Sequence, residues 1–237
     1  MVYNTRGIIL HRFMHDDNKM IVKIYTELYG TVSYICFRSS GGKKNANLFL
    51  PMSLVEMICE RKNKTNLDYV KDIKTLTSIN MGEYDIAKSS ICMFLNEILY
   101  KLLLDAGEDK ALFEFLFSSL FRFLEQGFSV DFHLRFLAAL TRELGFLPEN
   151  NFSLGMIFSV EKSCFVHNSS ADKDEQNLGF YFSRLLEQGL FPTDKQDIIP
   201  YIWRNQLLDM ILNYYSSHIV NLSQIKSHEV LKMVLHT

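Results

Sequence analysis

The sequence lacks the motifs of common metal-binding, redox and nucleotide-hydrolysing proteins. Its four cysteines, Cys36, Cys59, Cys92 and Cys164, stand singly with no C-x-x-C pair, which excludes a zinc ribbon and a dithiol redox site. It contains no G-x-S-x-G, no Walker-type loop and no G-x-G-x-x-G, so the usual acyl-transfer and phosphate-binding signatures are missing. We therefore expect a non-enzymatic protein without a metal ion or another cofactor.

Long hydrophobic runs are also missing. The most apolar stretches, 91–104 and 112–124, contain Asn96, Glu97, Lys101, Glu114 and Arg122. Neither reaches the roughly 20 apolar residues that a membrane helix needs. The first residues lead to an uninterrupted apolar stretch of only four positions, which is too short for a signal peptide. We expect a cytoplasmic protein that does not enter the membrane.

The charge is divided unevenly along the chain. Residues 1–80 carry 12 Lys and Arg against 7 Asp and Glu, whereas residues 81–237 carry 13 against 20. The first part therefore has a net charge of +5 and the second −7, which the overall value of −2 conceals. A basic first part predicts contact with a polyanion, and an acidic second part predicts contact with proteins.

The hydrophobic pattern changes at the same place. Before residue 80 it predicts five short strands, over 6–13, 19–28, 31–38, 49–60 and 66–75. Polar, basic segments at 39–45 and 61–65 separate some of these strands. Five short antiparallel strands in so few residues are typical of an OB-fold barrel.

After residue 82 the period becomes helical. Helices are expected over 83–105, 110–126, 130–144, 180–188, 197–215 and 227–235. Residues 156–160 and 164–167 predict a small hairpin within 152–168, and residues 169–177 read as a charged surface loop. The expected fold class is α+β: an N-terminal OB-fold β-barrel over 1–80, then a mostly α-helical domain over 81–237 that holds proteins.

Basic and aromatic side chains are interleaved in the first part. Single-strand binders combine cations for the phosphates with flat rings on which bases stack. The rings in question are Tyr25, Tyr34 and Phe37, and the cations are Arg6, Arg12, Lys19, Lys23, Arg38, Lys43, Lys44, Arg61, Lys62 and Lys64. Each residue alone is more simply a solvated cation or a core ring, but the cluster as a whole favours nucleic-acid binding.

The helical part carries a run of phenylalanines. Phe113, Phe115, Phe117, Phe121 and Phe123 occupy more than one face of a single helix, so most of them are expected in the core. Any that face outward would form a groove for an apolar anchor. Arg135 and Arg142 would then be possible clamps for a carboxylate.

Several blocks of the sequence together carry a resemblance to known proteins. The blocks are Thr5–Leu10, Lys19–Val22, Tyr25–Glu27 with Gly30, Arg38–Lys44, Leu50-Pro51, Leu144–Pro148, Tyr214–His218 and Ser227–Leu231. No block is decisive alone, but their order and spacing over about 230 residues specifically resemble one family, RecO, the bacterial recombination mediators.

The resemblance implies an OB-type barrel joined to a helical domain. It implies binding to single- and double-stranded DNA, annealing of complementary strands, and partnership with RecR. It further implies contact with the C-terminal tail of single-strand-binding protein, indirect action on the recombinase RecA, and a place at the bacterial nucleoid. The implied DNA contacts are Arg6, Lys19, Arg38, Lys43 and Lys44, and the implied tail contacts are Arg135 and Arg142.

One departure from the family concerns zinc. Some members carry a four-cysteine zinc site after the Leu-Gly-Phe-x-Pro turn, but this chain has only Cys164 there, with Asn150, Asn151 and Ser163. We expect no zinc, and a hairpin packed by Met156, Phe158, Phe165 and Val166 in its place.

Two alternatives remain open from the residues alone. One is an RNA-binding OB-fold protein, since a basic barrel does not separate RNA from DNA. The other is a scaffold that binds acidic proteins and no nucleic acid.

Overall fold

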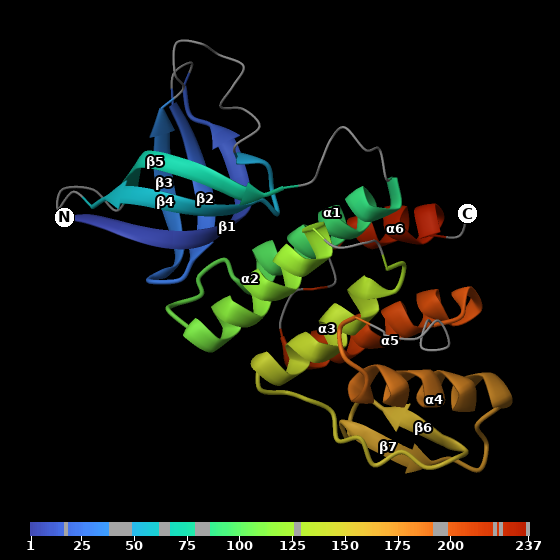
Figure 1. Ribbon diagram of the computed structural model, residues 1–237. Helices are drawn as coiled ribbons and strands as arrows, with labels where there is room; N and C mark the ends of the chain where they lie inside the picture. Colours follow the sequence, from blue (N-terminus) through green and yellow to red (C-terminus); the bar gives the residue numbers. More distant parts are fainter. Residues whose placement is uncertain are drawn as a thin grey trace. The chain divides into compact units, whose positions relative to one another are not determined.

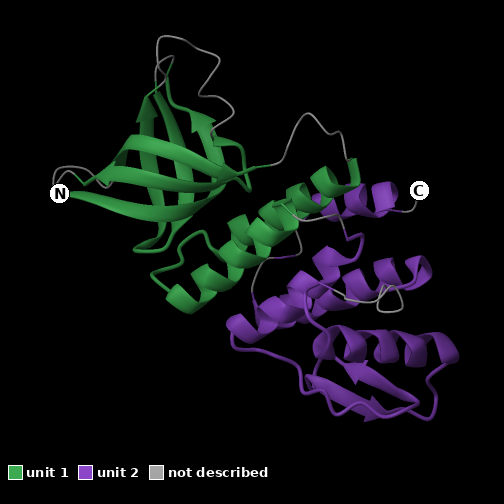
Figure 2. Cartoon of the chain, in the orientation of Figure 1, with its two compact units in different colours: residues 1–127 green, residues 128–237 purple. Residues whose placement is uncertain are grey.

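In the computed structural model, the residues that can be described are 1–16, 19–37, 49–61, 67–78, 86–125, 129–191, 199–219, 222 and 225–235. The chain divides into two compact units, Met1–Gly127 and Phe128–Thr237 (Figure 2). The first unit thus includes two helices in addition to the strands. The domain boundary near residue 80, where the sequence pattern changes, stays a prediction.

The first unit is built on a five-stranded barrel. Its strands are β1 (Val2–Met14), β2 (Lys19–Thr26), β3 (Gly30–Phe37), β4 (Leu54–Glu60) and β5 (Asp68–Thr77). They are ordered β1-β2-β3-β5-β4, and β4 pairs back onto β1 (Figure 1). Only the β3–β5 ladder is parallel among these pairs. The OB-like architecture expected from the sequence is confirmed.

Successive side chains along each strand alternate between the barrel interior and its outer surface. On β2, the side chains of Met20, Val22 and Ile24 are buried in the barrel core, as the sequence pattern predicts. Two of the three rings considered for stacking are buried too, as expected for a core ring, so they are not available to bases. Tyr34 lies in the core, and Tyr25 is covered by the ring of Phe113.

The barrel is joined to the two helices of its unit, α1 (Ile86–Leu102) and α2 (Lys110–Glu125), through the turn between β2 and β3. Thr31 donates its backbone N–H to the carbonyl of Ala106 over 2.9 Å. Gly30 has φ +66°, and a Cβ there would lie 2.2 Å from the Ala106 carbonyl oxygen. Only glycine fits this contact, because the obstructing atoms belong to backbone.

The second unit contains α3 (Phe132–Glu143), β6 (Met156–Ser159), β7 (Cys164–His167), α4 (Lys173–Glu187), α5 (Tyr201–His218) and α6 (Ser227–Leu235). Helices α3, α4 and α5 contact one another, and α4 packs against β6 (Figure 1). Helix α4 approaches the backbone of β6 closely at Gly179, where a Cβ would lie 2.6 Å from the Met156 carbonyl oxygen. Strands β6 and β7 pair antiparallel where the sequence predicts a hairpin.

The expected surface loop at 169–177 is partly wrong, because α4 already begins at Lys173. Its start is fixed by a capping box. The Asp172 carboxylate accepts the backbone N–H of Glu175 over 2.9 Å, and the Glu175 carboxylate accepts the N–H of Asp172 over 3.0 Å. The first turn is polar on every side, so it carries no apolar periodicity that would mark it as helical.

Candidate nucleic-acid interface

A row of apolar side chains crosses the outer surface of the barrel. Phe13 on β1 lies opposite Ile21 on β2, Ile21 lies opposite Ile35 on β3, and Ile35 lies opposite Tyr69 on β5. Phe13 is exposed and the other three are half-buried. We call these four residues, together with Phe37, the outer row. Apart from Phe37, its members could not be predicted from the sequence, because strand register, which aligns them, cannot be read from one strand at a time.

Phe37 is the most exposed member of the outer row, with 55% of its surface accessible. Its ring lies nearly parallel to that of Tyr69, with 6.2 Å between the centroids and 14° between the planes. Lys19 lies directly opposite Phe37 on β2 and forms an ion pair with Asp16 over 3.5 Å. The structure therefore places the predicted Lys19 opposite the exposed Phe37 ring, which lies near the half-buried Tyr69 ring.

Next to the outer row, the barrel surface is hollowed. Lys23 follows Ile21 on the same face of β2, and its ammonium lies 5.9 Å from the centre of the Tyr100 ring of α1. The hollow has a volume of about 650 Å³. It is lined by Lys23, Thr31, Val32, Ser33, Arg61, Leu67, Asp68, Leu104 and Asp105. Its two cations are balanced by two carboxylates, so it is less basic than the sequence of the barrel suggests.

Arg61 is held by a network that reaches into the barrel. Its guanidinium donates to the Asp68 carboxylate at 3.0–3.3 Å and lies 4.1 Å from the centre of the Tyr29 ring. Asp68 is buried, and it also accepts the Tyr3 hydroxyl over 2.6 Å. Burial and this hydrogen bond raise the pKa of Tyr3, and the bond to Asp68 raises the pKa of Arg61. Arg61 thus anchors the end of β4.

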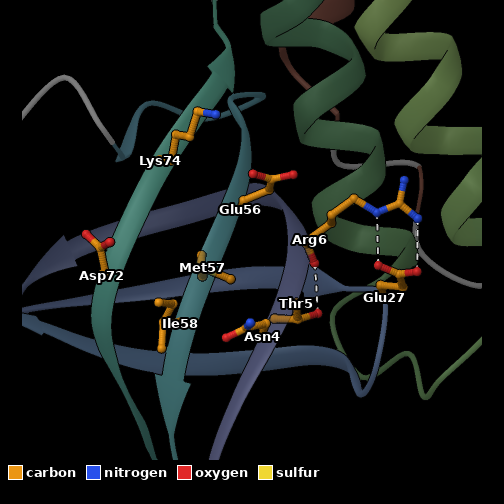
Figure 3. A pocket seen from close by; sticks show the side chains of 9 residues that line it. All are labelled: Asn4, Thr5, Arg6, Glu27, Glu56, Met57, Ile58, Asp72 and Lys74. Carbon is orange, nitrogen blue, oxygen red and sulfur yellow. Dashed lines mark hydrogen bonds and ion pairs between the residues drawn. The ribbon is translucent and has the colours of Figure 1, made fainter.

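Arg6, a predicted DNA contact, is bound within the first unit. Its guanidinium donates two hydrogen bonds of 2.9 Å to the Glu27 carboxylate (Figure 3), and also pairs with Glu114 of α2. It lies 5.4 and 5.0 Å from the ring centres of Phe113 and Phe117. The bonds to Glu27 raise the pKa of Arg6 and lower that of Glu27. These contacts join β1 to α2.

The surface beside Arg6 differs in character from the outer row. A hollow of about 490 Å³ lies on β1, β4 and β5 (Figure 3). It is lined by Asn4, Thr5, Arg6, Glu27, Glu56, Met57, Ile58, Asp72 and Lys74. Three carboxylates outnumber two cations there, which makes it a poor surface for a polyanion.

The other predicted DNA contacts, Arg38, Lys43 and Lys44, lie outside the described residues. Their place in the sequence is informative nonetheless. Arg38 directly follows Phe37, the last residue of β3. The assignment of these three cations to DNA stays a prediction.

In the second unit, Arg135 is buried rather than presented at the surface. Its guanidinium bonds to the Asp131 carboxylate over 3.1 Å and to the side-chain oxygen of Gln188 over 3.0 Å. Asp131 also accepts the Ser129 hydroxyl and the backbone N–H of Ile199. Burial alone would raise the pKa of Asp131, but the bonds from Ser129 and Arg135 and the arginine charge lower it.

Arg142 is exposed on the last turn of α3. It was expected to act together with Arg135 as a clamp. In the structure one of the two arginines is accessible and the other is bonded inside the unit. Arg142 alone therefore retains the surface position that the prediction needs, and its role stays a prediction.

The residues where a zinc site was considered have structural contacts. Asn151 bonds to the backbone of Phe165 in both directions, accepting its N–H over 2.8 Å and donating to its carbonyl over 3.1 Å. Asn150 donates to the carbonyl of Ser183 over 3.2 Å. Within the part of the chain that the structure describes, no three His, Cys, Asp or Glu residues converge on a possible metal position. None of the described helices has the length and apolarity to span a bilayer.

Comparison with known proteins covers almost the whole chain. Residues 1–79 match the family model described as Recombination protein O N terminal, and residues 83–227 match Recombination protein O C terminal. The chain is 32% identical to a DNA repair protein RecO of Azobacteroides pseudotrichonymphae, over 99% of both chains. It is 32% identical to that of Phocaeicola vulgatus, over 98% of both, and 30% identical to that of Flavobacterium psychrophilum, over 99% of both.

Proposed function

The chain belongs to the RecO family of DNA repair and recombination proteins, and on that premise we propose that it acts as a recombination mediator. It binds single- and double-stranded DNA and anneals complementary strands. With RecR, it helps to load the recombinase RecA onto DNA that is coated by single-strand-binding protein. This work requires no covalent chemistry and takes place at the nucleoid.

The observation that carries the proposal is the outer row on the basic barrel. The exposed Phe37 ring lies opposite Lys19, and Lys23 lies further along the same face of β2, in a part of the chain with a net charge of +5. Cations attract the phosphates, and each attracted phosphate releases counterions, so the affinity falls steeply as salt rises. Rings bind the bases with little preference for sequence, as a general mediator requires.

Annealing follows from the same two properties. Two strands repel each other through their phosphates, and a basic surface screens that repulsion. Bases that rest on rings stay unpaired and accessible to a complementary strand. The barrier to pairing falls without any group that takes or gives a proton.

The second unit is the proposed site for the tail of single-strand-binding protein. Arg142 offers an exposed guanidinium for a carboxylate, in the geometry that favours paired hydrogen bonds. Arg135 contributes by holding α3 to Gln188 rather than by touching the tail. Arg142→Ala is expected to weaken binding of an acidic, hydrophobic C-terminal peptide several-fold. Unchanged peptide binding would remove Arg142 from the site.

The decisive experiment is annealing of complementary oligonucleotides coated with the cognate single-strand-binding protein. The intact chain should accelerate annealing. A variant with Arg38, Lys43 and Lys44 changed to Ala should lose most of that activity, because it lacks three cations of the basic part. No annealing by either protein, together with no DNA binding at low salt, would overturn the proposed function.

A matched control removes the same number of charges from elsewhere. Lys110, Lys162 and Lys173 are exposed on helices or turns outside the barrel. Changing these three to Ala alters the net charge by the same amount as changing Arg38, Lys43 and Lys44 to Ala. The control should anneal like the intact chain; equal loss in both variants would indicate a general effect of charge.

A further inference from the structure

Resting on the proposed DNA binding, we propose that the outer row is a base-stacking subsite for single-stranded DNA, centred on Phe37 and Tyr69. The subsite is separate from the cations that hold phosphates of either DNA form. It would make the protein prefer single strands to duplex, a preference that charge alone does not supply.

The two rings have the geometry that stacking requires. Their planes are nearly parallel, 14° apart, and Phe37 exposes more than half of its surface. Phe37 is the last residue of β3, and Tyr69 lies near the start of β5, opposite Ile35 in the parallel ladder. Both rings are therefore set by strand backbone and not by a free loop. A base can lie on Phe37 without displacing part of the core.

The rest of the row extends the platform across four strands. Ile35, Ile21 and Phe13 continue from Tyr69 in register, over three strand spacings. At 4.7–4.9 Å per spacing the row is about 14 Å wide, enough for several apolar base contacts. Lys19 flanks the Phe37 end, and Lys23 lies beside Ile21 on β2.

A single strand fits this subsite better than a duplex does, because rings bind the flat faces of bases. In a duplex the faces of the bases are stacked inside the helix, and only phosphates and groove edges are accessible. A single strand can turn its bases onto rings while its phosphates approach lysines. The first part of the chain, which contains the outer row, carries a net charge of +5 and so attracts a nucleic-acid strand more than an uncharged apolar protein segment. The charge of the barrel thus favours the polyanion.

The test compares the affinity of the full-length protein for single strands and for duplex. Phe37→Ala should weaken binding of a fluorescent oligonucleotide about tenfold, the loss expected for one stacked base, and leave duplex affinity within twofold. Tyr69→Ala should act in the same direction. Phe121→Ala is the matched control, because Phe121 is also exposed, at 42%, but lies on α2. The control should bind both forms normally.

The salt dependence separates stacking from charge. Phe37→Ala should leave the slope of log affinity against log salt unchanged. Lys19→Ala should reduce it by about 0.7 for single strands, one phosphate contact. A reduced slope in Phe37→Ala would overturn the stacking assignment.

A second variant guards against a folding defect. Phe37→Trp keeps a large ring and should restore single-strand affinity, and its added fluorescence should be quenched by a single strand but not by duplex. Wild-type single-strand affinity in Phe37→Ala, or equal losses for both DNA forms, would overturn the inference while leaving DNA binding itself in place. Failure of the intact chain to bind DNA would instead overturn the proposed function.

Discussion

Each unit contains an arginine bonded to an aspartate, and the two pairs differ mainly in their surroundings. The closest ion-pair distance is 3.0 Å for Arg61 and Asp68 in the barrel and 3.1 Å for Arg135 and Asp131 in the second unit. The Arg61 side chain is 39% exposed, whereas neither side chain of the second pair is accessible. Bond lengths alone would rank the two pairs as equals.

Burial, rather than bond geometry, sets how much stability is lost when one partner of such a pair is removed. Removing one member of a buried pair leaves a charge without water or a counter-ion. Removing the exposed member of a half-buried pair lets water replace it. The pair in the second unit should therefore dominate the stability of that unit, and the pair in the barrel should contribute modestly.

The largest effect is expected for Arg135→Ala. It leaves the buried Asp131 carboxylate without its cation and should lower the free energy of unfolding of the second unit by about 3–5 kcal/mol. Trp203, the single tryptophan, is buried on α5 and reports unfolding of this unit by its fluorescence. A loss below about 1 kcal/mol would contradict the role given to the pair.

A double variant tests whether the loss comes from the unpaired buried charge. Changing Asp131 to Leu and Arg135 to Met together removes both charges and keeps most of the volume. Replacing a buried pair by apolar residues is often close to neutral. The double variant should be more stable than Arg135→Ala, as measured by the same fluorescence transition.

Acid should affect the second unit next most strongly, through His133. Burial lowers the pKa of His133 to about 3, although the Asp131 charge opposes the shift and that of Arg204 adds to it. The unfolded chain binds a proton near pH 6.5 and the folded chain does not, so stability falls as the pH drops from about 6.5 towards 3. Between pH 7 and 4 the loss is on the order of 3 kcal/mol.

The measurement is denaturant unfolding followed by Trp203 fluorescence at several pH values. His133→Asn removes the titrating group and should flatten the slope over this interval, because the other acids titrate equally in both proteins. Parallel slopes for the variant and the intact chain would mean that His133 titrates normally in the folded unit.

A smaller effect is expected for Arg61→Ala in the barrel. The change removes the cation near Tyr29 and one partner of Asp68, but Asp68 keeps the Tyr3 hydroxyl. The expected loss is about 1–2 kcal/mol, followed by the far-ultraviolet circular dichroism of the barrel. A loss as large as that of Arg135→Ala would erase the difference between the two pairs.

The smallest effect is expected for Arg6→Ala. Its partners Glu27 and Glu114 are both partly exposed, so the loss should be about 1 kcal/mol. Because Arg6 is occupied by carboxylates, its removal should change DNA affinity less than Lys19→Ala does. An anisotropy titration with one oligonucleotide compares the two variants, and a greater loss for Arg6 would support its predicted role as a DNA contact.

Much of the fold could be predicted because it depends on local patterns. Alternation in β2 and helical periods after residue 82 are properties of neighbouring residues, and they located the barrel, the hairpin and most helices. The start of α4 could not be found in this way, since it rests on the Asp172–Glu175 capping box in a polar segment. Local pattern thus failed where side chain–backbone bonds replace apolar contacts.

The candidate site was harder to predict because it depends on distant residues. Arg6 was predicted as a DNA contact and Arg135 as a contact for a protein tail, but their carboxylate partners lie on other elements or one helical turn away. The sequence offered Tyr25 and Tyr34 as stacking rings, although Phe113 and the barrel core cover them. Phe37 remained accessible, and its neighbour Tyr69 emerged only from the register of β3 with β5.

The glycine at the β2–β3 turn limits how this protein can be divided. Because Gly30 rests against the backbone of Ala106 and Gly107, the barrel depends on a surface that lies beyond residue 80. A fragment cut at residue 80 would leave that turn, and the covered ring of Tyr25, open to water. In a chimera between relatives, the smallest portable block is therefore residues 1–127, with barrel and both helices inherited together.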